Sequence, residues 1–284
     1  MKDKALQNTD PNWYHIEEVA PGIHIIQEPG YVQSYLVNGD ERSLLIDTGT
    51  GLQNIREAVH PLARPQLEVV NTHWHFDHIG GNALFERVGI AAVEAALIER
   101  DIENDELVRV LGPGFETRDF ALPKGLRLED YRIQGSKAAF TIADGDRFDL
   151  GGRVLEAIAT PGHTRGSLSF LDDASRCLLT GDFVYQDTYF LHFEESDVDR
   201  FLASLENMLG RRDAFDRLLP AHGPYPLPGS FLYAVRKAFR KIAGGAPPDD
   251  VDHSWGAANH RYHFETFDVL VKPPGTEGLR IFAG

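Results

Sequence analysis

Cysteine is almost absent from this 284-residue sequence, which contains Cys177 and no other. A single thiol excludes an internal disulfide and is typical of a protein kept in a reducing compartment. The segment Cys177-Leu178-Leu179-Thr180 predicts a buried strand, so we interpret this cysteine as a small core residue.

Long hydrophobic runs and an excess of basic residues are lacking as well. No apolar stretch approaches the ~18 residues that a membrane helix needs, and residues 1–8 lack the apolar segment of a secretory signal. We therefore expect a cytoplasmic protein without a membrane partner. The 28 basic residues face 43 acidic ones, and the net charge of -15 disfavours nucleic acid as a partner.

Histidine and aspartate, by contrast, are concentrated in one short run. His73-Trp74-His75-Phe76-Asp77-His78 contains four side chains that can bind a metal, and the pair Gly80-Gly81 follows it. Imidazoles two residues apart on extended backbone point to the same side, so His73 and His75 can bind one cation. Asp77 and His78 lie beyond the bend and can face a neighbouring cation.

Three later segments each place one candidate ligand just after an apolar stretch. They are Thr160-Pro161-Gly162-His163-Thr164, Thr180-Gly181-Asp182 and Pro220-Ala221-His222-Gly223. Alternating predicted strands and helices favour an α/β fold, in which sites lie at strand ends. The predicted strands are 23–26, 34–37, 43–46, 67–70, 154–159, 168–171, 177–179, 218–219 and 264–271, and the predicted helices are 52–59, 82–87, 198–209 and 231–243.

The order and spacing of these segments, with Leu45-Ile46-Asp47-Thr48-Gly49 upstream, resemble the metallo-β-lactamase superfamily over about residues 15–245. The resemblance implies a four-layer αββα sandwich of two mixed β-sheets flanked by helices. We expect a single domain over residues 1–284, with an insertion at about 101–138 and a C-terminal extension at about 246–284. The insertion is interpreted as a lid or substrate wall, or as a solvated spacer.

The resemblance also implies a ligand set, in which His73, His75 and His163 hold a first metal, Asp77, His78 and His222 a second, and Asp182 bridges the two. Imidazole and carboxylate ligands suit two Zn²⁺ ions, with iron as the alternative. Such metals lower the pKa of a bridging water towards ~7 and polarise a carbonyl oxygen. We therefore predict hydrolysis of a lactone, ester or thioester by a metal-bridging hydroxide, acting on a small acyl or lactone substrate. The resemblance is also compatible with a homodimer.

Three residues, Asp47, Asp77 and Tyr185, receive further roles from the resemblance. Asp47 matches an acid that orients a ligand or a nearby loop, although its alternative role is to form the turn Asp47-Thr48-Gly49. Asp77 would also pass a proton to the leaving group.

Tyr185, the third residue after Asp182, has the spacing of acyl-homoserine lactone lactonases and would donate to the developing oxyanion. With residues 161–167 it also resembles the acyl-thioesterase-like branch, so both substrate classes stay open. The predicted acyl pocket, with core packing as the alternative, comprises Phe183, Tyr189, Phe190 and His192.

Other activities of the superfamily are weighed against this ligand set. A persulfide dioxygenase-like oxidoreductase with one iron, a phosphodiesterase and a β-lactamase stay as alternatives. A β-lactamase would usually be exported, and aspartate is not typical at its bridging position. A transfer-RNA-processing nuclease would need a basic surface, and a scaffold protein would have lost ligand positions. Three histidines of the tail match no known ligand spacing: His253, His260 and His263.

Overall fold

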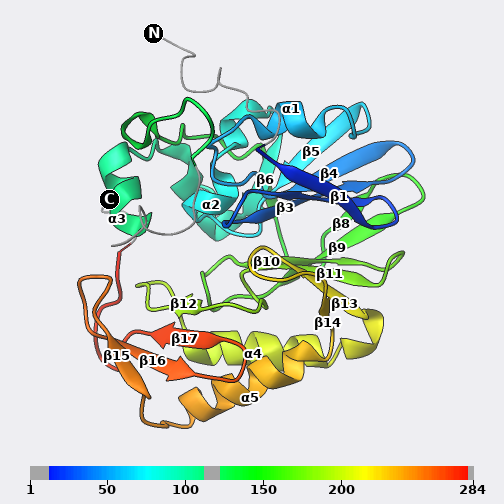
Figure 1. Ribbon diagram of the computed structural model, residues 1–284. Helices are drawn as coiled ribbons and strands as arrows, with labels where there is room; N and C mark the ends of the chain where they lie inside the picture. The colour runs from blue at the N-terminus through cyan, green and yellow to red at the C-terminus, as the bar shows by residue number, and fades with distance from the viewer. Residues whose placement is uncertain (1–12, 112–121, 281–284) are drawn as a thin grey trace. The chain divides into compact units, whose positions relative to one another are not determined.

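The computed structural model describes residues 13–111 and 122–280 (Figure 1). The chain divides into two compact units, Met1–Glu156 and Ala157–Gly284. The single domain expected over residues 1–284 stays a prediction. Residues 112–121 of the expected insertion, and the amino-terminal residues 1–12, lie outside the described residues.

The N-terminal unit is built on a seven-stranded sheet with the strand order β1-β2-β3-β4-β5-β6-β7. The first four strands pair antiparallel, whereas β4 to β7 pair parallel. The strands predicted over 23–26, 34–37 and 43–46 are confirmed as β2, β3 and β4, and β1 was missed because its residues are mostly polar and exposed. The strands are β1 His15–Ala20, β2 Ile23–Gln27, β3 Gln33–Asn38, β4 Arg42–Ile46, β5 Gln66–Val70, β6 Val88–Ala91 and β7 Phe140–Ile142.

The helical segments of this unit are short. The helix predicted from residue 52 begins only at Ile55, because the Asn54 side chain accepts a hydrogen bond from the Glu57 N–H and caps the helix there. The helix predicted over 82–87 is wrong beyond Leu84, where the chain extends towards β6. The segments are α1 Ile55–Val59, α2 Phe76–Ile79 and α3 Asn104–Leu111, with 3-10 turns η1 Asn82–Leu84, η2 Ala92–Glu94, η3 Leu97–Glu99 and η5 Leu128–Asp130.

The boundary between the units falls inside strand β9, Val154–Ala159, whose first half pairs antiparallel with β8, Arg147–Asp149. In the C-terminal unit the sheet continues in the order β14-β13-β11-β10-β9. Strand β11 pairs antiparallel with β10 and parallel with β13, so this sheet is mixed as well. Its strands are β10 Leu168–Asp172, β11 Cys177–Gly181, β13 Arg217–Pro220 and β14 Leu227–Pro228.

A second, four-stranded sheet in the C-terminal unit has the order β12-β17-β16-β15. It joins β12 Tyr189–Leu191 to the C-terminal strands β15 Asp250–Asp252, β16 Asn259–His263 and β17 Asp268–Val271. The strand predicted over 264–271 is wrong at its start, because residues 264–267 form a turn in which the Phe264 N–H donates to the Phe267 carbonyl. The C-terminal extension therefore forms regular strands, one of which pairs with β12.

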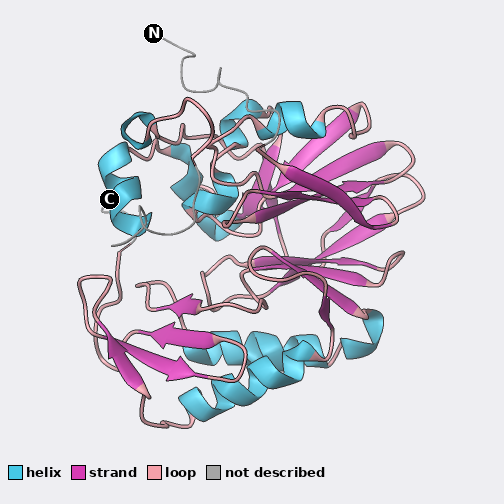
Figure 2. Cartoon of the chain, in the orientation of Figure 1, coloured by secondary structure: helices cyan, strands magenta, loops and turns pink. Residues whose placement is uncertain are grey.

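Helices α4, Val198–Leu209, and α5, Phe231–Ala243, have the bounds that the sequence predicts and lie side by side (Figure 2). Their apolar faces meet at Phe201 and Phe239, whose rings stack with centroids 4.2 Å apart. Both rings belong to one core cluster with Leu178 of β11 and Leu218 of β13. This packing fixes the strands after which the candidate ligands of the unit stand, and the mixed sheets with flanking helices confirm the predicted α/β class.

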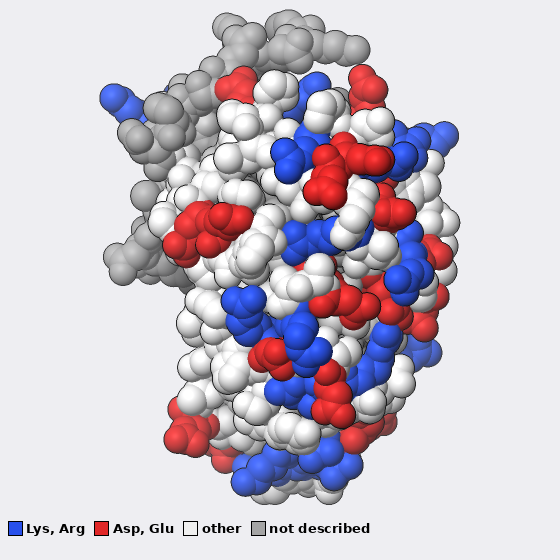
Figure 3. All heavy atoms as spheres, turned by 90° about the vertical axis from the view of Figure 1, so that its right-hand side faces the viewer, with Lys and Arg blue, Asp and Glu red and all other residues white. Residues whose placement is uncertain are grey.

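Charged side chains of both signs are interspersed on the face drawn in Figure 3. The net charge of -15 is therefore not gathered there into one acidic patch. Among the described residues no helix is both long and apolar enough to cross a membrane.

Candidate metal centre

The histidine run of the N-terminal unit leaves β5 and turns into α2. His75 is extended, at φ -61° and ψ 149°, and precedes the first helical residue. Ring centroids lie 4.5 Å apart for His73 and His75, and 4.0 Å apart for His73 and His78. In both pairs the ligand atoms lie within 4.8 Å of one another. On α2, Asp77 Oδ2 lies 3.8 Å from His78 Nε2. The four candidates thus converge within this unit.

Asp47 orients His78. Its Oδ2 lies 2.8 Å from Nδ1 of His78, and its Oδ1 accepts the Thr72 N–H at 2.7 Å. Because a carboxylate only accepts, Nδ1 carries the proton and Nε2 is left as the nitrogen that can ligate a metal. Asp47 also has a left-handed backbone, with φ 62°, at the turn that the sequence predicts.

The loop that follows β4 supports the segment with the candidate ligands His73 to His78 by direct backbone contact. A Cβ on Gly80 would lie 2.1 Å from the Thr50 carbonyl, so a larger residue cannot fit without moving one of the loops. The Thr48 N–H and the Asn71 side-chain amide both donate to the carbonyl of His78, at 2.8 and 3.0 Å. The position of His78 is therefore fixed through its backbone as well as its ring.

Glu28, which the sequence analysis did not single out, is buried against Thr50 in the loop that follows β4. It accepts hydrogen bonds from the Thr50 N–H at 3.0 Å and from the Thr50 hydroxyl at 2.5 Å. Burial raises the pKa of Glu28 from 4.5 to about 7; the Thr50 hydrogen bonds oppose the rise, and the charge of Asp77 adds to it. The Tyr131 hydroxyl donates to the Thr50 carbonyl at 2.6 Å. Glu28 stands before the turn Pro29-Gly30, and no local pattern marks it.

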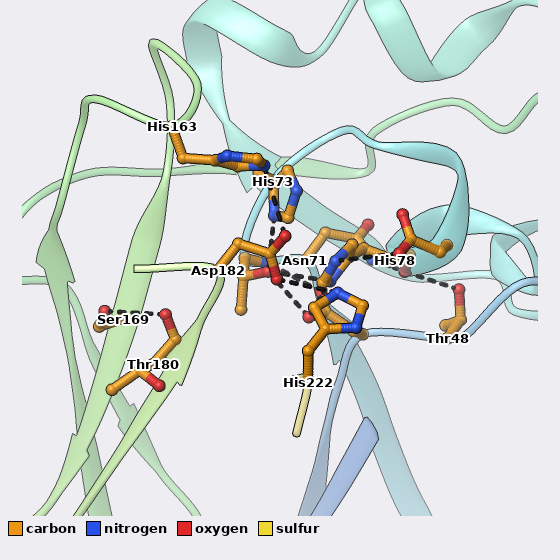
Figure 4. A network of polar contacts seen from close by, with 12 residues as sticks. Thr48, Asn71, His73, His78, His163, Ser169, Thr180, Asp182 and His222 are labelled. Carbon is orange, nitrogen blue, oxygen red and sulfur yellow. Dashed lines mark hydrogen bonds and ion pairs between the residues drawn. The ribbon is translucent and has the colours of Figure 1, made fainter. Parts of the chain in front are cut away.

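In the C-terminal unit, His163, Asp182 and His222 follow β9, β11 and β13 and point towards one another (Figure 4). Nε2 of His163 lies 3.4 Å from Asp182 Oδ2, and Nε2 of His222 lies 3.2 Å from Asp182 Oδ1. Two ligands of a tetrahedral zinc ion, each at ~2.1 Å, lie about 3.4 Å apart. Each carboxylate oxygen thus stands at a ligand-to-ligand distance from a different imidazole, which fits a bridging carboxylate.

His163 is oriented in the same manner as His78. Its Nδ1 donates to the Phe190 carbonyl at 3.0 Å, which leaves Nε2 towards Asp182. The Ser196 hydroxyl donates to the His163 carbonyl at 2.8 Å. Both imidazoles are thereby held in the tautomer that presents Nε2 to a metal.

Tyr185 is buried beside His222, with ring centroids 5.7 Å apart. Its hydroxyl donates to the Thr188 carbonyl at 2.8 Å, and its ring stacks on Tyr189. Burial raises the pKa of Tyr185 well above its usual value, and the charge of Asp182 adds to the rise. In this conformation the single phenolic proton is directed at Thr188, and the oxyanion role stays a prediction.

The remaining candidates divide between core and surface. Of the predicted acyl-pocket residues, Phe183 and Tyr189 belong to the core cluster of the C-terminal unit, whereas Phe190 and His192 do not. Nδ1 of His263 lies 2.9 Å from Oδ1 of Asp268. Within the described ranges, the tail histidines His253, His260 and His263 enter no group that could hold a metal ion.

The groups that could hold a metal ion do include all seven predicted ligands: His73, His75, Asp77, His78, His163, Asp182 and His222. Their donors, imidazole and carboxylate, fit a divalent metal.

Comparison with known proteins places the chain in a family. The profile of the metallo-beta-lactamase superfamily matches residues 28–248. An acyl-coenzyme A thioesterase of Homo sapiens, MBLAC2, is 31% identical over 237 residues, which cover 74% of this chain and 81% of that protein. The chain therefore belongs to the metallo-β-lactamase superfamily of metal-dependent hydrolases, as the sequence motifs predict.

Solved structures share the fold at lower identity. A sec-alkylsulfatase from Pseudomonas sp. has a TM-score of 0.64 and 18% identity, covering 81% of this chain and 42% of that one. A metallo-beta-lactamase from Pontibacter korlensis has a TM-score of 0.56 and 19% identity, covering 80% of this chain and 99% of that one. These similarities confirm the predicted fold.

Proposed function

We propose that this chain is an acyl thioesterase with a binuclear metal centre. The observation that carries the proposal is the 31% identity to a thioesterase, of which the matched region covers 81%. Zinc is the metal we expect, with iron as the alternative. The proposed ligands are those that the sequence predicts: His73, His75 and His163 for one metal, Asp77, His78 and His222 for the other, and Asp182 between them.

The ligand geometry inside each unit supports this assignment. Asp47 and the Phe190 carbonyl hold His78 and His163 in the tautomer that presents Nε2. The two oxygens of Asp182 face two different imidazoles, an arrangement that would suit a carboxylate shared by two cations. A bound metal pair supplies a water of lowered pKa and polarises the substrate carbonyl.

The chain's own residues handle the proton. In thioester hydrolysis the oxygen of water bonds to the carbonyl carbon, the carbon–sulfur bond breaks, and the sulfur receives a proton. Asp77, whose side chain is 14% exposed, is the proposed carrier of that proton from the water to the departing thiolate. Asp47 acts through His78, as a positioning residue.

The test is a metal analysis followed by parallel assays on the purified protein. We expect about two metal ions per chain, and turnover of acyl-coenzyme A or glutathione thioesters in preference to lactones, phosphodiesters and a β-lactam. Hydrolysis of phosphodiesters alone would contradict the proposal. A single iron per chain with oxygen consumption on glutathione persulfide would instead establish the dioxygenase alternative.

A further inference from the structure

An aromatic cluster lies beside His163 in the C-terminal unit. Strand β12 alternates in the usual way, so that Tyr189 and Leu191 enter the core while Phe190 and His192 take the other face. Trp255 covers that other face, with ring centroids 5.7 Å from Phe190 and 5.2 Å from His192. His192 is fully buried, whereas Phe190 and Trp255 are half-buried.

The cluster is joined directly to the candidate metal ligand. The Phe190 carbonyl accepts the proton of His163 Nδ1 at 3.0 Å. The His163 ring also meets the Phe193 ring edge-on, with ring centroids 6.1 Å apart. The Phe193 ring packs in turn on the His192 ring, with centroids 4.3 Å apart. The His163 ring therefore adjoins the cluster through Phe193 and through the Phe190 backbone.

Trp255 comes from the C-terminal extension, on the loop between β15 and β16. The base of that loop is fixed by the ion pair of Arg261 with Asp252 and by the Ser254 N–H, which donates to Asp252 at 2.9 Å. The family match ends at residue 248, so Trp255 lies outside the part that defines the superfamily. Side chains contributed by such an extension are suited to set substrate preference rather than the shared chemistry.

Core packing does not account for the exposed parts of Phe190 and Trp255. Both rings are half-buried and lie outside the hydrophobic core cluster of the unit, whereas His192 is fully buried. An anchored loop that holds half-buried aromatic faces beside a metal ligand forms an apolar contact surface for a ligand.

We propose that Phe190 and Trp255 form the surface that binds the acyl chain of the substrate, so that Trp255 determines chain-length specificity. The inference rests on the proposed thioesterase function. The acyl chain is the occupant because its first carbons adjoin the carbonyl that must reach the metals, whereas the nucleotide of coenzyme A is many bonds from the sulfur. Apolar contacts with each added methylene then favour longer chains.

The experiment compares Trp255→Ala and Trp255→Phe with wild type on acetyl-, octanoyl- and palmitoyl-coenzyme A. For Trp255→Ala we expect kcat/KM to fall about tenfold for palmitoyl and by less than about twofold for acetyl thioesters. Trp255→Phe keeps an aromatic face and should retain most of the preference. Tyr233→Ala, which removes an exposed ring from α5 of the same unit, is the matched control and should leave the series unchanged.

A binding arm separates this inference from the proposed function. Calorimetry with a non-hydrolysable palmitoyl thioether of coenzyme A needs no turnover, and Trp255→Ala should weaken its binding about tenfold. Equal binding by both proteins, or an equal loss of kcat/KM at every chain length, would overturn the inference. So would a chain-length effect that vanishes when pantetheine replaces coenzyme A, because Trp255 would then contact the nucleotide. If wild type cleaves no thioester, the proposed function fails while the binding arm still decides the role of Trp255.

Discussion

The two ligand sets reach their positions by different routes. In the N-terminal unit, four candidates come from one loop and the helical turn that follows it, between His73 and His78. In the C-terminal unit, His163, Asp182 and His222 follow three different strands. The first set depends on local backbone shape, whereas the second depends on the pairing of strands far apart in sequence.

The supports of the two sets differ accordingly. The N-terminal loop is held by polar groups, with Asp47 on the His78 ring and Glu28 on Thr50. In the C-terminal unit the candidate ligands Asp182 and His222 depend on the register of β11 and β13, in which Gly181 pairs with Pro220. We therefore expect the first set to respond to single polar substitutions and to pH, and the second to changes in the shared carboxylate.

The largest effect is expected for Asp182→Ala, which removes the carboxylate that both C-terminal imidazoles face. Substitutions of groups behind a metal ligand cost 10- to 100-fold, so loss of a bridging ligand should cost more than about a hundredfold in rate. Metal content, measured by elemental analysis, should fall together with kcat/KM. Asp173→Ala, at the exposed turn before β11, is the control. Unchanged metal content and rate would remove Asp182 from the bridge.

A pH test addresses the polar support of the N-terminal set. In the folded protein the pKa of Glu28 is raised to about 7 from 4.5, so the folded state retains a proton that the unfolded state has lost between these values. Stability should therefore fall as pH rises from about 4.5 to about 7, by up to about 3 kcal/mol from this group.

Glu28→Gln should remove this decrease in the free energy of unfolding between about pH 4.5 and about pH 7. Urea unfolding of metal-free protein across the same pH range measures it, because bound cations would favour the carboxylate and hide the effect. Glu41→Gln, at an exposed carboxylate of the same unit, is the matched control. If the slope of Glu28→Gln equals that of wild type, the buried carboxyl does not titrate in this range.

The sequence predicts features that depend on neighbouring residues better than features that depend on contacts between distant segments. The strands before His163, Asp182 and His222 and the bounds of α4 and α5 are written in local patterns and are confirmed. The histidine run is a local pattern as well, and its role as a ligand set stays a prediction. Glu28 and Trp255 have no such pattern, because burial and ring contacts arise only when distant segments pack together. The strand predicted at residues 264–271 is too long at its start, because its apolar residues Phe264 and Phe267 also suit a turn against the core.

Asp47→Asn weakens the N-terminal set by a smaller amount. The amide keeps the size of the side chain but removes the charge that accepts the His78 proton, at a site where the contact is 2.8 Å. Loss of such a partner typically lowers metal affinity 10- to 100-fold. Competition with a chelator measures that affinity, and Asp40→Asn at the exposed turn after β3 is the control. Equal affinity in Asp47→Asn and wild type would limit Asp47 to the turn.

The smallest effect is expected for Tyr185→Phe, which asks whether the C-terminal unit supplies more than metal ligands. The hydroxyl donates to Thr188, so it can reach a developing oxyanion only by giving up that bond. An oxyanion donor alone is worth 10²- to 10³-fold, and this competition should reduce the loss of kcat to about tenfold with metal retained. Tyr189→Phe removes a neighbouring buried hydroxyl, which donates to the Tyr185 carbonyl, and serves as the control. If both variants lose about 1 kcal/mol of stability but keep the wild-type kcat, the Tyr185 hydroxyl is structural, and the C-terminal unit acts through His163, Asp182 and His222 alone.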